Sequence, residues 1–182
     1  KRQFLTNFEA PNYRLVKILF TGEVVEIIPE TDLALKSVSI LDDFIITNSI
    51  NTDMNSMIEF YSKDGELLDY KIPNDIEGTL SSFRMYKGKL RFSASDFINP
   101  TRYIDLDLNS LDYTIVWQDK VSNFNPADYE KTFTYYESKD GTMVPLTYFH
   151  RKDLEINSET PVFLYGYGGY NISIRPSFSR KY

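Results

Sequence analysis

The chain has 182 residues, 42% of them hydrophobic, and its 20 Lys and Arg against 26 Asp and Glu leave a net charge of −6. This is enough apolar material for one ordinary domain or two small ones, and the excess of acid argues against a nucleic-acid partner, which needs a basic surface. The absence of cysteine excludes disulfides and thiolate chemistry, and no apolar run approaches the ~20 residues that cross a bilayer, so we expect no membrane partner.

Apolar and polar residues alternate with period two through the first two thirds of the chain, as in half-buried strands, and the aromatic content of 15% also favours strands. Two polar turns, Lys63–Glu66 and Lys87-Gly88, contain the glycine that supplies the positive φ of tight hairpins. We expect strands at Phe4–Thr6, Tyr13–Ile18, Val24–Ile28, Phe44–Asn48, Met57–Tyr61, Leu67–Lys71, Leu80–Tyr86, Lys89–Ser95, Thr101–Asp107 and Leu111–Trp117.

A weak repeat underlies these strands. FLTN at Phe4–Asn7 returns as IITN at Ile45–Asn48, and LRFS at Leu90–Ser93 takes the corresponding place in a third unit; by subtraction the units start 41 and then 45 residues apart. A four-stranded propeller blade takes ~40–45 residues. The sequence therefore predicts a mainly β fold, with about two and a half blades of a partial β-propeller in residues 1–120. A β-sandwich with similar strand spacing is the alternative, and a partial propeller needs further blades upstream.

The pattern changes after the polar segment Gln118–Tyr129, which marks a linker or domain boundary. Strands at Thr132–Glu137 and Met143–Tyr148 flank the hairpin signal Lys139–Gly141. The apolar run Val162–Tyr165 shows no polar alternation, which is typical of a strand buried on both faces of an α/β sheet. Residues 121–182 are therefore expected to form a linker and the N-terminal part of a second domain.

The glycine-rich loop GYGGYN, Gly166–Asn171, follows this apolar run directly. In open α/β sheets ligands bind at the carboxyl ends of strands, so this loop is the best site candidate in the chain. A phosphate-binding loop is disfavoured, because the spacing is not G-x-G-x-x-G and Pro176 stands where the phosphate-binding helix should run. A purely structural turn is the other alternative.

Three stretches occur in order between Asn125 and Pro176: NPADYE, ESKDGTMVPLTYFHRK and PVFLYGYGGYNISIRP. Their sequence, order and spacing resemble the opening of the hydrolase domain in the prolyl oligopeptidase family of serine peptidases. The resemblance implies a propeller followed by the first strands of an α/β-hydrolase domain. It also implies that the whole protein, with the remainder of its polypeptide, hydrolyses short proline-containing peptides on the carboxyl side of proline without a cofactor.

The resemblance also implies roles for two tyrosines of the loop. The second tyrosine of the YGYGG motif, Tyr167, would supply its hydroxyl to the oxyanion hole, since a phenol can donate a hydrogen bond to the alkoxide of a tetrahedral intermediate. Tyr170 would line the substrate pocket, at a position where the family commonly has phenylalanine. The rest of the loop would support these two side chains: Gly166, Gly168, Gly169 and Asn171.

No catalytic triad is expected within the chain, which should be inactive alone. It has no G-x-S-x-G elbow, and its one histidine, His150, precedes the nucleophile region, whereas α/β-hydrolases follow the order serine, acid, histidine. A calcium loop starting at Asp105 is disfavoured because Ser110 and Val116 stand where glycine and glutamate are needed. With one histidine and no cysteine, we expect no metal site.

Two other functions stay open from the sequence. A related oligopeptidase, oligopeptidase B, shares the architecture but cleaves after basic residues, and the pocket residues that would decide lie outside the chain. A non-enzymatic propeller could instead bind a partner by strand pairing at an edge or through a blade face. A chain without cysteine fits either redox environment, and we expect the cytoplasm rather than the periplasm or secretion.

Overall fold

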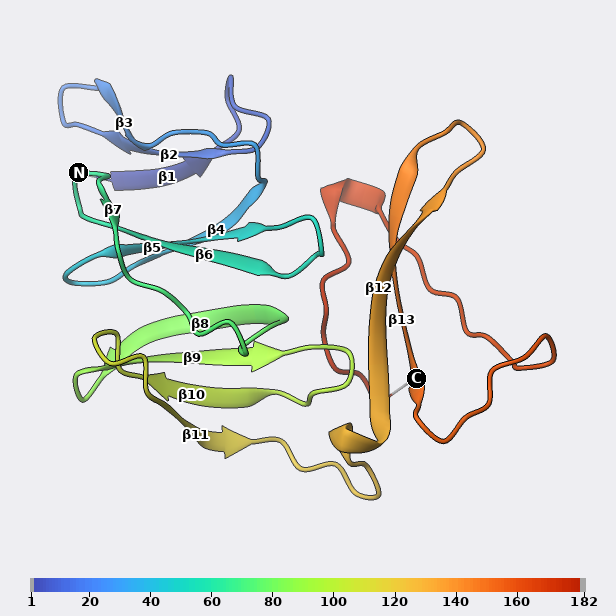
Figure 1. The fold of residues 1–182 in the computed structure, drawn as a ribbon. Coiled ribbons are helices and arrows are strands. Elements are labelled where there is room, and N and C mark those ends of the chain that lie inside the picture. The colour runs from blue at the N-terminus through green and yellow to red at the C-terminus, as the bar shows by residue number, and fades with distance from the viewer. Residues whose placement is uncertain (1, 181–182) are drawn as a thin grey trace.

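The computed structural model describes residues 2–180, which form an almost entirely β structure (Figure 1). Within these residues, thirteen strands form three stacked antiparallel sheets and a separate two-stranded hairpin. No helix in this part of the chain has the length and hydropathy of a membrane span. The predicted partial β-propeller is confirmed, and each stacked sheet is one blade.

Each blade is a meander whose neighbouring strands follow one another in the sequence. The first blade has three described strands, and the middle and last blades have four each. In chain order the strands are β1 (Arg2–Thr6), β2 (Arg14–Ile18), β3 (Val24–Ile28), β4 (Leu35–Ile40), β5 (Ile45–Ile50), β6 (Ser56–Tyr61), β7 (Leu67–Leu68), β8 (Thr79–Tyr86), β9 (Lys89–Ser95), β10 (Arg102–Leu106) and β11 (Tyr113–Gln118).

The sequence repeat falls on equivalent strands. IITN lies in β5 and LRFS in β9, and both are second strands of four-stranded blades. FLTN begins in β1, which leads the three-stranded blade in the same way that β5 leads β6 and β7. The repeat therefore marks the second strand of a blade, and the first strand of the middle blade, β4, was missed. Its sequence, LKSVSI, lacks strict alternation.

The core lies at the two seams between blades. Neighbouring residues of β5 face opposite ways: Ile45 packs with Leu15 and Ile28 of the first blade, while Ile46 packs with Phe92 of the last blade. Successive side chains of a strand alternate between its faces. All six residues of β5 are buried, so this strand is the centre of the stack.

A long hairpin, β12 (Tyr129–Glu137) and β13 (Met143–Arg151), stands beside the ends of the blades (Figure 1). Its predicted turn is confirmed: Gly141 has φ of 84°, and Ser138 N–H donates to Thr142 O over 2.8 Å. Phe149 stacks on Phe97 of the last blade with ring centroids 5.6 Å apart. A short 3-10 turn, η1 (Pro126–Asp128), leads into the hairpin.

The expectation of a buried strand at Val162–Tyr165 is wrong for this structure. The run is not a strand, none of the four sheets includes it, and Val162 and Leu164 are 84% and 80% exposed. A strand is held by hydrogen bonds to neighbouring strands, and none lies alongside this run within the described residues. Its apolar character alone does not make a strand.

Candidate functional site

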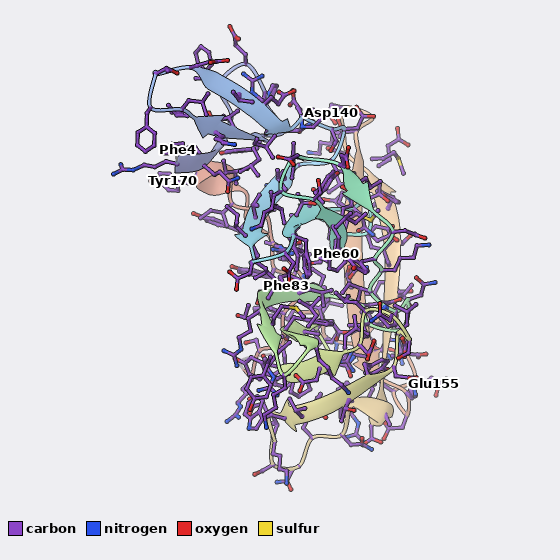
Figure 2. All side chains as sticks on the ribbon, turned by 90° about the vertical axis from the view of Figure 1, so that its left-hand side faces the viewer. Phe4, Phe60, Phe83, Asp140, Glu155 and Tyr170 are labelled. Carbon is purple, nitrogen blue, oxygen red and sulfur yellow. The ribbon has the colours of Figure 1, made fainter. Side chains whose placement is uncertain are left out.

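The glycine-rich loop lies beside the first blade, away from the core. Figure 2 shows Phe60 and Phe83 inside the stack of blades and Tyr170 at the level of Phe4 in the first blade. The loop ends in a second 3-10 turn, η2 (Gly169–Asn171), which Ile172 closes by donating its N–H to Gly169 O over 3.1 Å. The loop is thus an exposed turn with a defined end.

Tyr167 folds back over its own loop. Its side chain is half exposed, and a Cβ added to Gly169 would lie 3.0 Å from the phenol oxygen and 3.2 Å from the ring carbon that carries it. At Gly166 and Gly168 an added Cβ would meet nothing within 4 Å. Of these three glycines, only Gly169 has the Tyr167 ring close to where a side chain would start, so its missing Cβ leaves room for that ring.

Tyr170 is presented to solvent by an unusual backbone. It has φ of 56° and ψ of 31°, the left-handed region that non-glycine residues adopt rarely, and its side chain is 94% exposed. Strained residues of this kind cluster at functional sites. Asn171 completes the turn, and its side chain lies outside the described part of the structure.

The chain beyond the loop is anchored on the blades and the linker. Residues 172–180 run back between the blades and the hairpin (Figure 1). Arg175 donates to Asn48 Oδ1 over 3.2 Å and to Ser56 Oγ over 2.5 Å. Phe178 N–H donates to Ser95 Oγ over 3.1 Å, and its ring meets Phe124 at 5.0 Å. These contacts hold the loop from its carboxyl side.

One open groove lies apart from the loop. It has a volume of about 420 Å³ and lies between the last blade and the hairpin, and no residue of the GYGGYN loop lines it. Lys131 Nζ lies 3.5 Å from carboxylate oxygens of both Glu77 and Asp96. Lys131 of the hairpin therefore pairs with carboxylates on the other side of the groove, and neither Tyr167 nor Tyr170 lines the groove.

His150 and Asp105, to which the sequence analysis gave no catalytic or metal-binding role, have partners away from the loop. His150 lies opposite Glu130 in the hairpin, with Nε2 at 3.3 Å from its carboxylate, and its Nδ1 is 2.9 Å from Arg151 O. Asp105 receives two hydrogen bonds from Arg91, which lower the pKa of its carboxyl. Among residues 2–180 no three histidine or carboxylate side chains form a group that could hold a metal ion.

Sequence reasoning missed Arg175, Asn48 and Ser56 as neighbours of the candidate site. Asn48 belongs to the repeated IITN motif, which indicated a strand but not a contact with the loop. Arg175 and Asn48 are 127 residues apart in the sequence. No local pattern indicates a pair at that separation.

The family model described as "Prolyl oligopeptidase, N-terminal beta-propeller domain" matches residues 3–119. Prolyl oligopeptidase A of Galerina marginata is 30% identical over 96% of this chain and 24% of its own length, and prolyl endopeptidase of Dictyostelium discoideum is 31% identical over 97% and 25%. The solved structure of prolyl oligopeptidase B from Galerina marginata, bound to a 35-residue hydrolysis and macrocyclization substrate, superposes with a TM-score of 0.83 at 28% identity. It covers 97% of this chain and 26% of that one. The chain thus spans about a quarter of the length of these relatives.

Proposed function

Because this chain belongs to the prolyl oligopeptidase family, we propose that it is part of a serine-type endopeptidase that hydrolyses short peptides on the carboxyl side of proline. The names of its relatives, prolyl endopeptidases among them, support this class of reaction. The single observation in the chain that carries the proposal is the exposed loop with Tyr167 folded over Gly169.

The proposed division places the C-terminal part of the propeller in residues 1–120, and the linker and N-terminal part of an α/β-hydrolase domain in residues 121–182. Two observations support it. The last blade strand, β11, ends at Gln118, and the propeller family match ends at residue 119. The hairpin that follows forms a sheet of its own.

Tyr167 would donate a hydrogen bond to the oxyanion of the tetrahedral intermediate. Tyr167 is half exposed as a residue, and the turn closed between Gly169 and Ile172 defines the end of the loop. Such a fixed donor stabilises the negative charge that develops in the transition state. The second donor in α/β-hydrolases is the backbone N–H after the nucleophile, and no G-x-S-x-G elbow occurs in this sequence.

Tyr170 would contribute to the substrate pocket. Its exposed ring offers an apolar face for a substrate group, and its hydroxyl adds a polar edge. With Tyr167 supplying one donor and the triad lying elsewhere in the polypeptide, the chain alone would have no peptidase activity. The whole protein would need the remainder of the hydrolase domain.

The test is Tyr167→Phe in the whole protein, assayed with a fluorogenic peptide that contains proline before the cleaved bond. Removing one oxyanion donor should lower kcat by about 10²–10³-fold with a much smaller change in KM. Tyr136→Phe is the matched control, because Tyr136 lies on the hairpin and is 51% exposed against 49% for Tyr167. A Tyr167→Phe protein with the kcat of the control would remove Tyr167 from the mechanism.

Peptides with arginine or lysine in place of proline test the alternative specificity in the same assay. Faster cleavage of the basic peptides would favour an oligopeptidase that cleaves after basic residues. A folded whole protein that cleaves neither set would favour a non-enzymatic interaction module.

A further inference from the structure

Arg175 is a half-buried cation, and no carboxylate within residues 2–180 forms an ion pair with it. Its guanidinium donates to two neutral oxygens, Asn48 Oδ1 and Ser56 Oγ, and its Nε is buried without a hydrogen-bond partner in the described residues. Burial lowers the pKa of Arg175. An arginine that is partly desolvated without a counter-ion is unfavourable by itself, so its position calls for a role.

The two acceptors of Arg175 also join the middle blade to the last blade. Asn48 Nδ2 donates to Leu80 O over 2.7 Å, and Leu80 N–H donates to Ser56 Oγ over 2.9 Å. Both backbone groups of Leu80, in β8, are thereby held by side chains of β5 and β6. Arg175 therefore binds the two side chains that clamp this seam.

Within the described residues, Arg175 is also the first side chain after the candidate loop that forms hydrogen bonds with a blade. Only Ile172, Ser173 and Ile174 separate it from η2, and the buried Pro176 follows it. A chain segment spans at most about 3.6 Å per residue. The distance that the loop can move from the blade seam is therefore limited by where Arg175 is fixed.

We infer that Arg175 is a positioning residue, which fixes the Tyr167–Tyr170 loop relative to the propeller through its contacts with Asn48 and Ser56. Both hydrogen bonds come from the terminal nitrogen Nη2, and the planar guanidinium suits this task because it holds the N–H groups of that nitrogen in a fixed geometry. A shift of the oxyanion donor by about 1 Å can cost ~10² in rate, so an anchor at this position affects catalysis without touching the substrate. This inference rests on the proposed function of Tyr167.

The test compares Arg175→Met and Arg175→Lys in the whole protein. Arg175→Met keeps much of the apolar stem but removes every donor, and it should lower kcat by about 10–100-fold with a smaller change in KM. Amide hydrogen exchange over residues 164–174 should become faster while β5 and β9 keep their protection. Arg175→Lys retains a single cationic donor group and should restore part of kcat and of the protection.

Arg180→Met is the matched control, because Arg180 lies on the same segment, pairs with Asp119 at 3.2 Å and is largely exposed. It should leave both kcat and loop exchange unchanged. Wild-type kcat together with wild-type loop exchange in Arg175→Met would overturn the inference.

The exchange measurement separates this inference from the proposed function. If the whole protein has no peptidase activity, the proposed function fails, and equal loop exchange in Arg175→Met and Arg180→Met would still overturn the anchor. Arg175→Met could also make amide exchange in β5 and β9 faster, which would mean that the substitution disturbs the blades themselves. In that case Arg175→Lys becomes the variant that tests the anchor. Faster loop exchange with β5 protected supports the anchor, and wild-type loop exchange in that variant overturns it.

Discussion

Strand β5 in the middle blade and the run Val162–Tyr165 before the candidate loop lie in opposite environments, and their compositions run against the difference. The six residues of β5, IITNSI, include two hydroxyls and an amide, yet all are buried. The run VFLY is wholly apolar or aromatic, yet all four of its side chains are exposed. The more polar segment is the one in the core.

Neighbouring strands account for this difference. β5 is paired with β4 and β6 in its own sheet and is covered by the first and last blades on its two faces. Its polar side chains find partners there, as Asn48 does with Leu80 and Arg175. A buried polar group with a hydrogen-bond partner is tolerated, while an apolar run outside a sheet gains no burial from its composition.

The largest effect expected from this difference comes from truncating one apolar side chain in each region. Phe92 is fully buried at the seam of the middle and last blades, so Phe92→Ala should lower the free energy of unfolding by about 3–5 kcal/mol. Leu164 is largely exposed, so Leu164→Ala in the same chain should change it by less than about 0.5 kcal/mol. Urea unfolding followed by circular dichroism measures both.

Measuring the same two variants, Phe92→Ala and Leu164→Ala, in the whole protein sharpens the comparison. If a hydrolase sheet covers the apolar run there, the cost of Leu164→Ala should rise towards the ~2–5 kcal/mol of a buried leucine. Equal costs for Phe92→Ala and Leu164→Ala in the chain itself would contradict the exposed position of the run.

Alanine substitutions at glycines whose surroundings differ should have a smaller effect on the free energy of unfolding. Gly65 in the β6–β7 turn has φ of 91°, and an added Cβ would overlap Ile27 O and lie 3.0 Å from the Ile27 carbonyl carbon. Backbone strain and the clash together should make Gly65→Ala destabilising by about 2–4 kcal/mol. Gly88 has a similar φ of 77° but open space, so Gly88→Ala should cost only about 1–2 kcal/mol.

Gly168 in the candidate loop completes this series. It has neither a positive φ nor a neighbour within 4 Å of an added Cβ, so Gly168→Ala should leave the unfolding midpoint in urea unchanged. A loss at Gly168 as large as at Gly65 would show that the loop is packed more closely than the structure describes.

The sequence predicted the blades well because their strands are local. Each expected strand between Phe4 and Trp117 overlaps an observed one, and the glycine turns at Gly65 and Gly88 are confirmed by their positive φ. Alternation and turn residues act between neighbours in sequence, which is how a meander is built. β4 was not predicted because its apolar residues do not alternate strictly with polar ones.

The candidate site could be predicted only in part. Tyr167 and Tyr170 lie in a compact motif, so their resemblance to a family identified them, and their roles stay predictions. The close approach of Tyr167 to Gly169 depends on a ring conformation, and the contact of Arg175 with Asn48 depends on how blades and linker pack. Neither leaves a periodic signal in the sequence.

The smallest expected effect is on how stability depends on pH. It compares one carboxylate in the last blade with one in the hairpin turn. Arg91 and Asp105 are opposite each other on β9 and β10, and Arg91 donates to the two carboxylate oxygens over 2.5 and 2.7 Å. The Arg91 hydrogen bond is the largest cause of the lowered pKa of Asp105. In the hairpin, the pKa of Asp140 is lowered chiefly by the backbone N–H of Thr142, in an exposed turn.

A folded-state pKa below the unfolded value of about 3.9 means that the ionised carboxylate stabilises the fold above that pH. This contribution is lost as pH falls through the lower folded value. Urea midpoints at several pH values from neutral down to the acid limit of solubility should therefore fall less steeply in Asp105→Asn than in the wild type. Asp140→Asn should flatten the profile less, because water replaces the hydrogen bonds of an exposed turn more easily than an ion pair between strands. Equal flattening would mean that the Arg91 pair contributes no more to stability than the turn does.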